Sequence, residues 1–421
     1  MKEEGDWSSE RRRPPHGSTT SDGRSVIPEW ASLPPELVER IADCVLSTTG
    51  GVDAYMDMRA VCPSWRSAIA KPSPLAGVTD LRFRSRHWVM VDLKSKNHDN
   101  DARLFLHAPT GRFRRLRLPV LRDHLVLGAS DGLIILRSRE RPDLTGVRVL
   151  NPLTGDMLQF AAPLWEHLGS ADEFLTALSG PPSLTMVVWR DWEWRWHTVI
   201  HGDPTSAEFT EEEAGGSLLA SMVTFQGNIY YADTNGRVFQ FVAQAEQCDH
   251  KFVVIAQMPL HMDIHLDRGD SAPSYLVESA GELLLVRHFD ETLKVFRVDI
   301  KRKMLEEVKS IGSCCALFLG DERCVSVDAD KLPSIDGDCI YMFNWVDISE
   351  QVYSLRDNRM ELISNEPKLR ANKHPPKSFH EAPWFDSWRF ETSANNHQLR
   401  PLSLIQVLLD YCNDATHFYN V

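Results

Sequence analysis

The residue types best suited to metal or acid–base chemistry lie in two short runs. In His261-Met262-Asp263-Ile264-His265, an extended chain would place both imidazoles and the carboxylate on one face. A metal ion would need further convergent ligands, which the sequence does not suggest, so a solvated strand face is the favoured interpretation. The acidic run Glu211-Glu212-Glu213 precedes Gly215-Gly216 and is typical of a loop rather than of paired catalytic acids.

Other motifs that would indicate catalysis are missing from the sequence. It contains no P-loop and no HExxH pattern, and Gly227 and Gly281 stand alone as turn glycines. The sequence therefore predicts no catalytic residue, no metal site and no cofactor, and indicates a protein that is not itself an enzyme.

The most unusual local feature is a cluster of tryptophans near the middle of the chain. Trp192, Trp194 and Trp196 alternate with Glu193 and Arg195, so a single strand would carry the three rings on one face. Buried rings would belong to the core, which is favoured because large aromatic residues usually supply packing. Exposed rings would anchor a target protein, so the three tryptophans are also the candidate target-binding residues.

Composition places the chain among globular proteins. It has 421 residues, 43% of them apolar and 25% charged, which is more than one typical domain of roughly 100–200 residues needs. Collagen-like, coiled-coil and wholly disordered proteins are thereby excluded. No apolar run approaches the roughly 20 residues that cross a bilayer, and residues 1–6 lack a secretory signal, so we expect a soluble protein of the cytoplasm or nucleus. The eight cysteines show no CxxC spacing and are expected to be reduced thiols.

Charge is distributed unevenly along the chain. Residues 1–150 carry 24 Lys and Arg against 19 Asp and Glu, whereas the remainder carries 22 against 40. An acidic body repels phosphate backbones and anionic lipid, so we expect neither nucleic acid nor a membrane as a partner. Arg112, Arg114, Arg115 and Arg117 form a basic strand-like run that would suit an acidic substrate, although a solvated face is favoured.

Residues 29–73 have the pattern of a compact helical unit. Pro34-Pro35 suits a first helical turn, and residues 47–51 break the helix before a second helical pattern that Pro63 interrupts. The apolar residues of the first helix recur every four positions: Leu37, Ile41 and Val45. A unit this short cannot bury all of its apolar surface internally, which predicts a protein partner.

Residues 75–362 have the pattern of a repeated β-structure. Short strand-like runs, beginning with residues 81–84, are separated by turns at residues 109–112, 151–155 and 233–236. The first two of these turns lie about one unit of roughly 40–50 residues apart, and the last two lie about two such units apart. This spacing predicts a β-propeller of six to seven degenerate blades.

The two ends of the chain have different patterns. Residues 1–28 contain too little apolar surface to fold, so we expect a disordered tail. Residues 363–421 are expected to be a partly helical segment, docked or flexible, because Leu402, Ile405, Leu408 and Leu409 form a helix-like stripe.

Two runs in the helical unit resemble the F-box family. They are Leu33-Pro34-Pro35-Glu36-Leu37, followed by Ile41, and Val61-Cys62-Pro63-Ser64-Trp65-Arg66-Ser67-Ala68. In that family three helices dock on the Skp-type adaptor of a cullin–RING ubiquitin ligase. The resemblance implies these adaptor-binding residues: Leu33, Pro34, Leu37, Ile41, Val45, Met58, Val61, Cys62, Trp65 and Arg66.

Five later stretches resemble the KIB-type β-propeller, an F-box-associated domain of plant proteins. They are residues 225–233, 275–286, 294–299, 317–320 and 338–341. The two resemblances together imply a mainly β protein, with an N-terminal three-helix F-box followed by the propeller. The expected function is that of a substrate-recognition subunit, whose F-box binds the adaptor and whose propeller binds an unknown target protein. Two alternatives stay open: an adaptor-binding protein that acts without ubiquitination, and a propeller enzyme.

Overall fold

The computed structural model describes most of the chain from residue 30 onward. The described residues are 30–48, 51–91, 101–140, 146–164, 174–181, 184–192, 196–213, 219–242, 252–258, 273–289, 292–344, 349–363 and 403–413. The expected tail of residues 1–28 and most of the C-terminal segment lie outside them.

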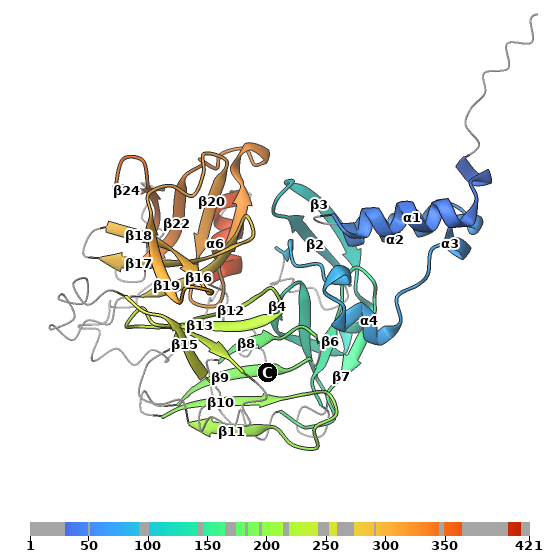
Figure 1. Ribbon diagram of the computed structural model, residues 1–421, viewed down its shortest axis with the longest axis horizontal. Helices are drawn as coiled ribbons and strands as arrows, with labels where there is room; N and C mark the ends of the chain where they lie inside the picture. The colour runs from blue at the N-terminus through green and yellow to red at the C-terminus, as the bar shows by residue number, and fades with distance from the viewer. Residues whose placement is uncertain are drawn as a thin grey trace, which may run out of the picture.

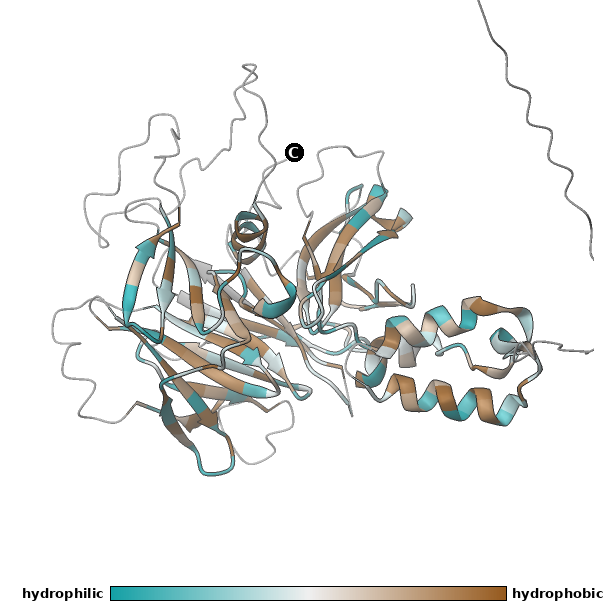
Figure 2. Ribbon diagram, turned by 90° about the horizontal axis from the view of Figure 1, so that it is seen from above, coloured by the Kyte–Doolittle hydropathy of each residue, from teal (hydrophilic) through white to brown (hydrophobic). Residues whose placement is uncertain are grey.

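A helical unit precedes the β-structure and projects from one side of it (Figures 1 and 2). Its elements are η1 (Trp30–Ser32), α1 (Pro35–Leu46), α2 (Gly51–Val61) and α3 (Pro63–Ala68). Two further elements, α4 (Pro74–Thr79) and the 3₁₀ helix η2 (Leu81–Phe83), form a linker to the first strand. Prolines occupy the first turn of α1, α3 and α4, where their missing N–H leaves no hydrogen bond unmade.

One stripe of α1 forms the core of the helical unit. Val38, Ala42 and Leu46 recur every four residues and are buried. They pack against apolar side chains of α2, of the residue that follows α3 and of the linker: Val52, Tyr55, Ile69 and Phe83. The stripe expected from the sequence, Leu37, Ile41 and Val45, lies beside the buried one and is more exposed.

The rest of the described chain forms six sheets arranged as a six-bladed β-propeller (Figure 1). This confirms the predicted fold, with the smaller of the two expected blade numbers. The first sheet contains β1 (Trp88–Met90), β2 (Ala102–His107) and β3 (Arg112–Arg117); the second contains β4 (His124–Ser130), β5 (Leu133–Ser138), β6 (Arg148–Leu150) and β7 (Met157–Gln159). The third contains β8 (Phe174–Leu178), β9 (Met186–Trp192), β10 (Trp196–Gly202) and β11 (Thr210–Glu213); the fourth contains β12 (Leu219–Phe225), β13 (Asn228–Asp233), β14 (Val238–Phe241) and β15 (Phe252–Ala256). The fifth contains β16 (Ser274–Ser279), β17 (Glu282–Phe289), β18 (Thr292–Asp299) and β19 (Met304–Val308); the sixth contains β20 (Cys315–Leu319), β21 (Val325–Asp328), β22 (Cys339–Asn344), β23 (Ser349–Ser354) and β24 (Arg359–Leu362).

The second to fifth sheets are built alike. Each has four antiparallel strands in chain order, and the first strands of these four successive sheets contact one another at the centre of the ring. The sixth sheet departs from this pattern because its order is β21-β20-β22-β23-β24, with β20 and β22 parallel. Consequently β21 makes most of the contact between the sixth sheet and β16 at the centre.

The hydrophobic core of the ring lies between the sheets. Each of the six interfaces between neighbouring sheets contains an apolar cluster of buried side chains. The largest fully buried side chains include Phe105, Phe296, Phe318 and Tyr353 from four such clusters. Face-to-face packing of successive sheets therefore stabilises the ring.

A C-terminal helix packs where the first and sixth sheets meet. Helix α6 (Leu404–Cys412) begins with a capping box formed by Ser403 and Gln406. Its buried side chains, Ile405, Leu408, Leu409 and Cys412, share a cluster with β20 and β22. The cluster also contains Leu106 of β2 and Ala108, which directly follows β2. Its last turn is held by the sixth sheet, because the Cys412 carbonyl accepts hydrogen bonds from the amides of Glu322 and Arg323.

The local expectations have mixed outcomes. The predicted turns near Gly111, Gly155 and Gly236 are confirmed, and all three glycines have positive φ values of 65–74°. The predicted strand at residues 81–84 is wrong, because Asp80 caps a 3₁₀ turn by accepting a hydrogen bond from the amide of Arg82. The predicted loop at residues 211–213 is also wrong, because these residues pair with β10 as part of β11.

Helix α6 should contribute measurably to ring stability. Leu408 is fully buried between the first and sixth sheets, so Leu408→Ala should lower the free energy of unfolding by about 2–5 kcal/mol. The half-buried Val407 on the same helix is the matched control, and Val407→Ala should have a clearly smaller effect. Thermal unfolding of the full chain measures both; equal melting temperatures for Leu408→Ala and wild type would contradict this placement of α6.

Candidate functional site

Four large apolar side chains are exposed on the helical unit. On α1, Leu37 and Ile41 are 45% and 42% exposed, and Val61 at the end of α2 is 61% exposed. Trp30 of η1, also 61% exposed, belongs to the same unit. We call these four residues the helical apolar face. Exposed apolar groups concentrated on a unit of this size mark a protein-binding surface.

The remaining residues predicted to bind an adaptor lie on the same helical unit, and none of them is fully buried. Pro34 and Arg66 are exposed, and the others are partly buried: Leu33, Val45, Met58, Cys62 and Trp65. Three of the partly buried side chains, Leu33, Met58 and Trp65, pack against the core of the helical unit and therefore also support its fold.

Trp30 is a residue of this surface that the sequence analysis missed. Its carbonyl accepts a hydrogen bond of 2.9 Å from the indole nitrogen of Trp65, which ties η1 to α3. The available signal was its position, three residues before Leu33 and the Pro34-Pro35 run.

Three ion pairs join the helical unit to the first sheet. On α2, Asp53 is buried and lies 3.4 Å from an Arg112 nitrogen and 3.9 Å from an Arg114 nitrogen. The guanidinium of Arg114 also donates a 2.7 Å hydrogen bond to Asp57. Two of the four arginines in the basic run therefore bind helix α2 of the same chain rather than a substrate.

The linker between the helical unit and the ring is bonded to residues inside the ring. The Arg84 guanidinium donates to the carbonyl of Ser179 and forms a 2.7 Å ion pair with Asp131, whose carboxylate lies on the β4–β5 turn. The side-chain amide of Asn151 donates to the carbonyls of Gly77 and Phe83. Together with the α2–β3 ion pairs, these bonds fix the direction in which the helical unit projects.

The tryptophan cluster does not lie on one strand. Strands β9 and β10 form a hairpin in which Trp192 and Trp196 are opposite each other, so the predicted continuous strand is wrong. The reason is that the chain reverses between them, which the alternating pattern alone does not reveal. Trp194 lies outside the described residues, as do the side chains of Trp192 and Trp196 and the whole of residues 261–265.

The run Gly128-Ala129-Ser130-Asp131-Gly132 has the GxSxG spacing of hydrolase nucleophiles, which the sequence analysis overlooked. In those enzymes the serine stands on a strand-to-helix turn, whereas here it ends β4 in a strand-to-strand hairpin. The Ser130 hydroxyl is buried, accepts from the amide of Leu178 and contacts the hydroxyl of Thr224 at 3.0 Å. Its role is to join the second, third and fourth sheets.

The shifted titratable groups of the ring occupy packed positions. Desolvation raises the pKa values of Tyr341 and Cys324 to about 12 and lowers that of His87 to about 4. Within the described ranges, no group of three or more His, Cys, Asp or Glu side chains could hold a metal ion. None of the helices described is long and apolar enough to span a membrane.

Comparison with known proteins identifies the β-structure. A family model described as the KIB1-4 beta-propeller matches residues 105–365. No curated protein sequence matches the chain.

Solved structures resemble the chain only at low similarity. An oligogalacturonate lyase in complex with manganese is 11% identical, with 66% of this chain and 77% of that chain covered and a TM-score of 0.33. A Vibrio parahaemolyticus oligogalacturonate lyase is 10% identical, with 66% and 78% covered and a TM-score of 0.33. A prolyl endopeptidase is 13% identical with a TM-score of 0.27; 78% of this chain is covered, but only 54% of the length of that enzyme.

The α2–β3 ion pairs can be tested with two double variants of equal charge change. Arg112→Ala with Arg114→Ala leaves the buried Asp53 carboxylate without its cations, so the free energy of unfolding should fall by about 1–3 kcal/mol. Arg115→Ala with Arg117→Ala removes two exposed arginines of the same strand and should change the free energy of unfolding by less than about 0.5 kcal/mol. Denaturant unfolding compares them, and equal losses would show that the ion pairs do not hold the helical unit.

Proposed function

Because the chain belongs to the KIB1-4 β-propeller family, we propose that it is a substrate-recognition subunit of a cullin–RING ubiquitin ligase. In this proposal the helical unit is an F-box that binds the Skp-type adaptor, and the ring binds the protein to be ubiquitinated. The subunit supplies proximity rather than bond chemistry, because it raises the effective concentration of target lysines near the charged ubiquitin carrier.

The observation that carries the proposal is the helical apolar face. Leu37 and Ile41 are not needed to build the helical core, because Val38, Ala42 and Leu46 on the neighbouring stripe already do so. Exposed leucine and isoleucine on a helix that is packed on its other side are best explained by a partner that covers them. Their positions match the F-box motif residues that meet the adaptor.

The fixed junction supports the same function. A receptor of this kind has to hold its target at a defined distance from the adaptor, because misplacement lowers the rate of transfer. The bond between Arg114 and Asp57 joins the helical unit to the ring, and the bonds of Arg84 and Asn151 join the linker to the ring. The proposed adaptor-binding and target-binding parts therefore form one connected body.

Charge indicates the kind of target that the ring would bind. The chain after residue 150 carries 22 basic and 40 acidic residues. A complementary target surface would be basic, and its association with the ring would slow as salt is added. Propellers bind partners mainly with loops on one ring face, because their strands are already paired.

Adaptor binding provides the first test. The double change Leu37→Ala and Ile41→Ala removes exposed side chains, so it should abolish capture of the Skp-type adaptor while leaving the melting temperature unchanged. Met304→Ala with Leu362→Ala is the matched control, since these residues are 43% and 55% exposed on outer strands of the ring. Pull-down of purified adaptor measures both, and undiminished capture by the α1 variant would remove the F-box assignment.

The tryptophan cluster provides a second test that needs no knowledge of the target. If Trp192, Trp194 and Trp196 belong to the core, as favoured, each alanine change should cost about 3–5 kcal/mol of stability. Trp30→Ala, which removes an exposed ring from the helical unit, should leave the melting temperature close to wild type. Thermal unfolding of the four single variants distinguishes the two roles. Unchanged melting temperatures for the three variants of the cluster would instead favour a target-binding role.

A further inference from the structure

Strand β3 is an edge strand of the first sheet. The order of this sheet is β1-β2-β3, whereas the second to fifth sheets have four strands each. In the part of the chain that the structure describes, no strand pairs with the side of β3 that faces away from β2. We call this side the free edge of β3.

The register of β3 identifies the backbone groups on its free edge. The amide of Leu118 donates to the carbonyl of Asp101, so the even-numbered residues of β3 exchange hydrogen bonds with β2. The amides and carbonyls of Phe113, Arg115 and Arg117 point the other way, and among the described residues they have no hydrogen-bond partner. An edge of this kind is a template for one further strand.

The same three residues share one face of the sheet. Phe113 is 50% exposed, and Arg115 and Arg117 are exposed and form no ion pair with any residue that the structure describes. The two arginines of the other face are already paired with helix α2. Side chains directly opposite each other on neighbouring strands interact, so an added strand would meet one aromatic ring and two unpaired guanidiniums.

The charge of β3 differs from that of the other edge strands of the ring. It carries four arginines and no acidic residue. The last strands of the other five sheets carry no charge (β7 and β15), only glutamates (β11 and β19), or one charge of each sign (β24). Like charges directly opposite each other are destabilising, so β3 disfavours pairing with a second copy of itself and favours an acidic strand.

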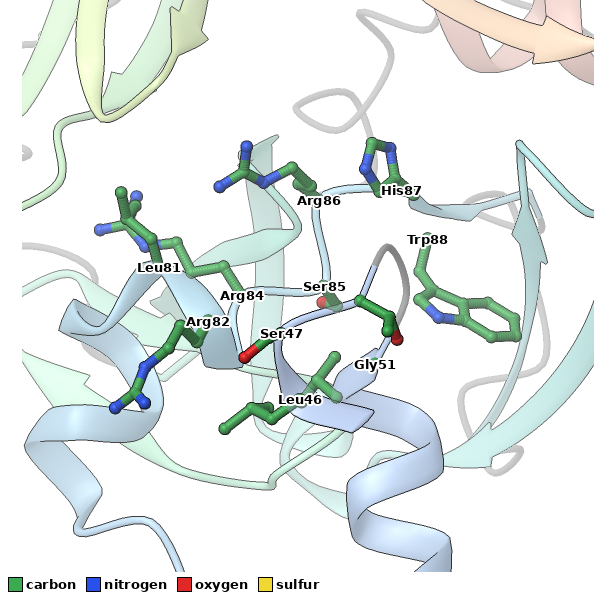
Figure 3. A pocket seen from close by; sticks show the side chains of 12 residues that line it. Leu46, Ser47, Gly51, Leu81, Arg82, Arg84, Ser85, Arg86, His87 and Trp88 are labelled. Atoms are coloured by element: carbon green, nitrogen blue, oxygen red, sulfur yellow. The ribbon is translucent and has the colours of Figure 1, made fainter. Parts of the chain in front are cut away.

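The β1 side of the first sheet borders a cavity that offers a weaker site. It has a volume of about 280 Å³ and is lined by Trp88 of β1 together with residues of α1, α2 and the linker (Figure 3). Arg84 and Arg86 on its wall both pair with Asp131, and Arg86 points away from Trp88. These side chains do not converge on one ligand, so the free edge of β3 is the better candidate for a partner.

We propose that the free edge of β3 binds an extended acidic segment of a partner protein as an added antiparallel strand. Both strand pairs within this sheet are antiparallel, and antiparallel pairing is the slightly more stable form. Acidic residues two positions apart lie opposite Arg117 and Arg115, and an apolar residue two positions further on lies opposite Phe113.

This surface serves a contact beyond those of the proposed function. It contains no residue of the helical apolar face, and its occupant is acidic, whereas the target surface proposed above is basic. Loss of adaptor binding would therefore leave the free edge of β3 able to bind its partner.

Fluorescence anisotropy of short capped peptides with the full chain tests the site. The probe Thr-Glu-Val-Glu-Thr-Val-Thr places its glutamates opposite Arg117 and Arg115 and its second valine opposite Phe113. We expect saturable binding that weakens as salt is added. The same peptide with lysine in place of both glutamates should not bind, because it meets the arginines with like charge.

A backbone-modified peptide separates strand addition from charge attraction alone. In the proposed register the amides of the two glutamates point at β3, so N-methylation of both removes two hydrogen-bond donors without changing the charge. The Kd should rise by about tenfold or more, as expected for two lost hydrogen bonds.

Charge variants of the protein locate the binding on β3. Arg115→Gln with Arg117→Gln removes two exposed cations and should raise the Kd of the probe by about threefold or more, as expected for two exposed ion pairs. Lys301→Gln with Arg302→Gln makes the same charge change on an exposed turn of the fifth sheet and should leave the Kd unchanged.

Any of three results would overturn the proposal. The first is that the acidic probe does not bind, as would follow if a second copy or another segment of this chain occupied the edge. The second is that the N-methylated peptide binds as tightly as the probe. The third is that the variant changed at Arg115 and Arg117 binds the probe as well as the control variant does.

Discussion

The position of the helical unit depends on Arg84, whose side chain extends from the end of the linker into the ring. Its side chain is fully buried and donates to the carbonyls of Val78 and Ser179 and to the carboxylate of Asp131. These acceptors belong to the linker and to the second and third sheets, so one side chain joins three parts of the chain. Removal of one partner from such a buried pair typically costs about 3–5 kcal/mol, because the remaining charge stays buried. Buried hydrogen bonds and an ion pair therefore hold the junction between the helical unit and the ring.

Much of the architecture was predictable because its signals are local. Apolar spacing of four residues and the Pro34-Pro35 run identified α1, and turn residues near Gly111, Gly155 and Gly236 identified three hairpins. The repeat length predicted a propeller, but degenerate repeats left six and seven blades open. The number of blades is set by how wide each packed wedge of side chains is, which the turn spacing does not encode.

The parts that sequence reasoning missed depend on contacts between distant segments. Both stripes of α1 are apolar, and only the packing of Val52 and Tyr55 against one of them decides which is buried. The pairing of Arg114 with Asp57 joins residues 57 positions apart, and nothing near either residue predicts it. Likewise, alternation around Trp194 fits a strand and a hairpin equally well, because both place side chains with a period of two.

The central claim is that the helical unit connects the target protein, which the ring binds, to a ubiquitin ligase. Affinity purification from cells with the proteasome blocked, comparing wild type with the variant carrying Leu37→Ala and Ile41→Ala, tests this most directly. The account predicts that both chains capture the same proteins, because the ring is unchanged, but that these proteins carry ubiquitin only with wild type. Equal ubiquitination of the captured proteins with both chains would contradict it.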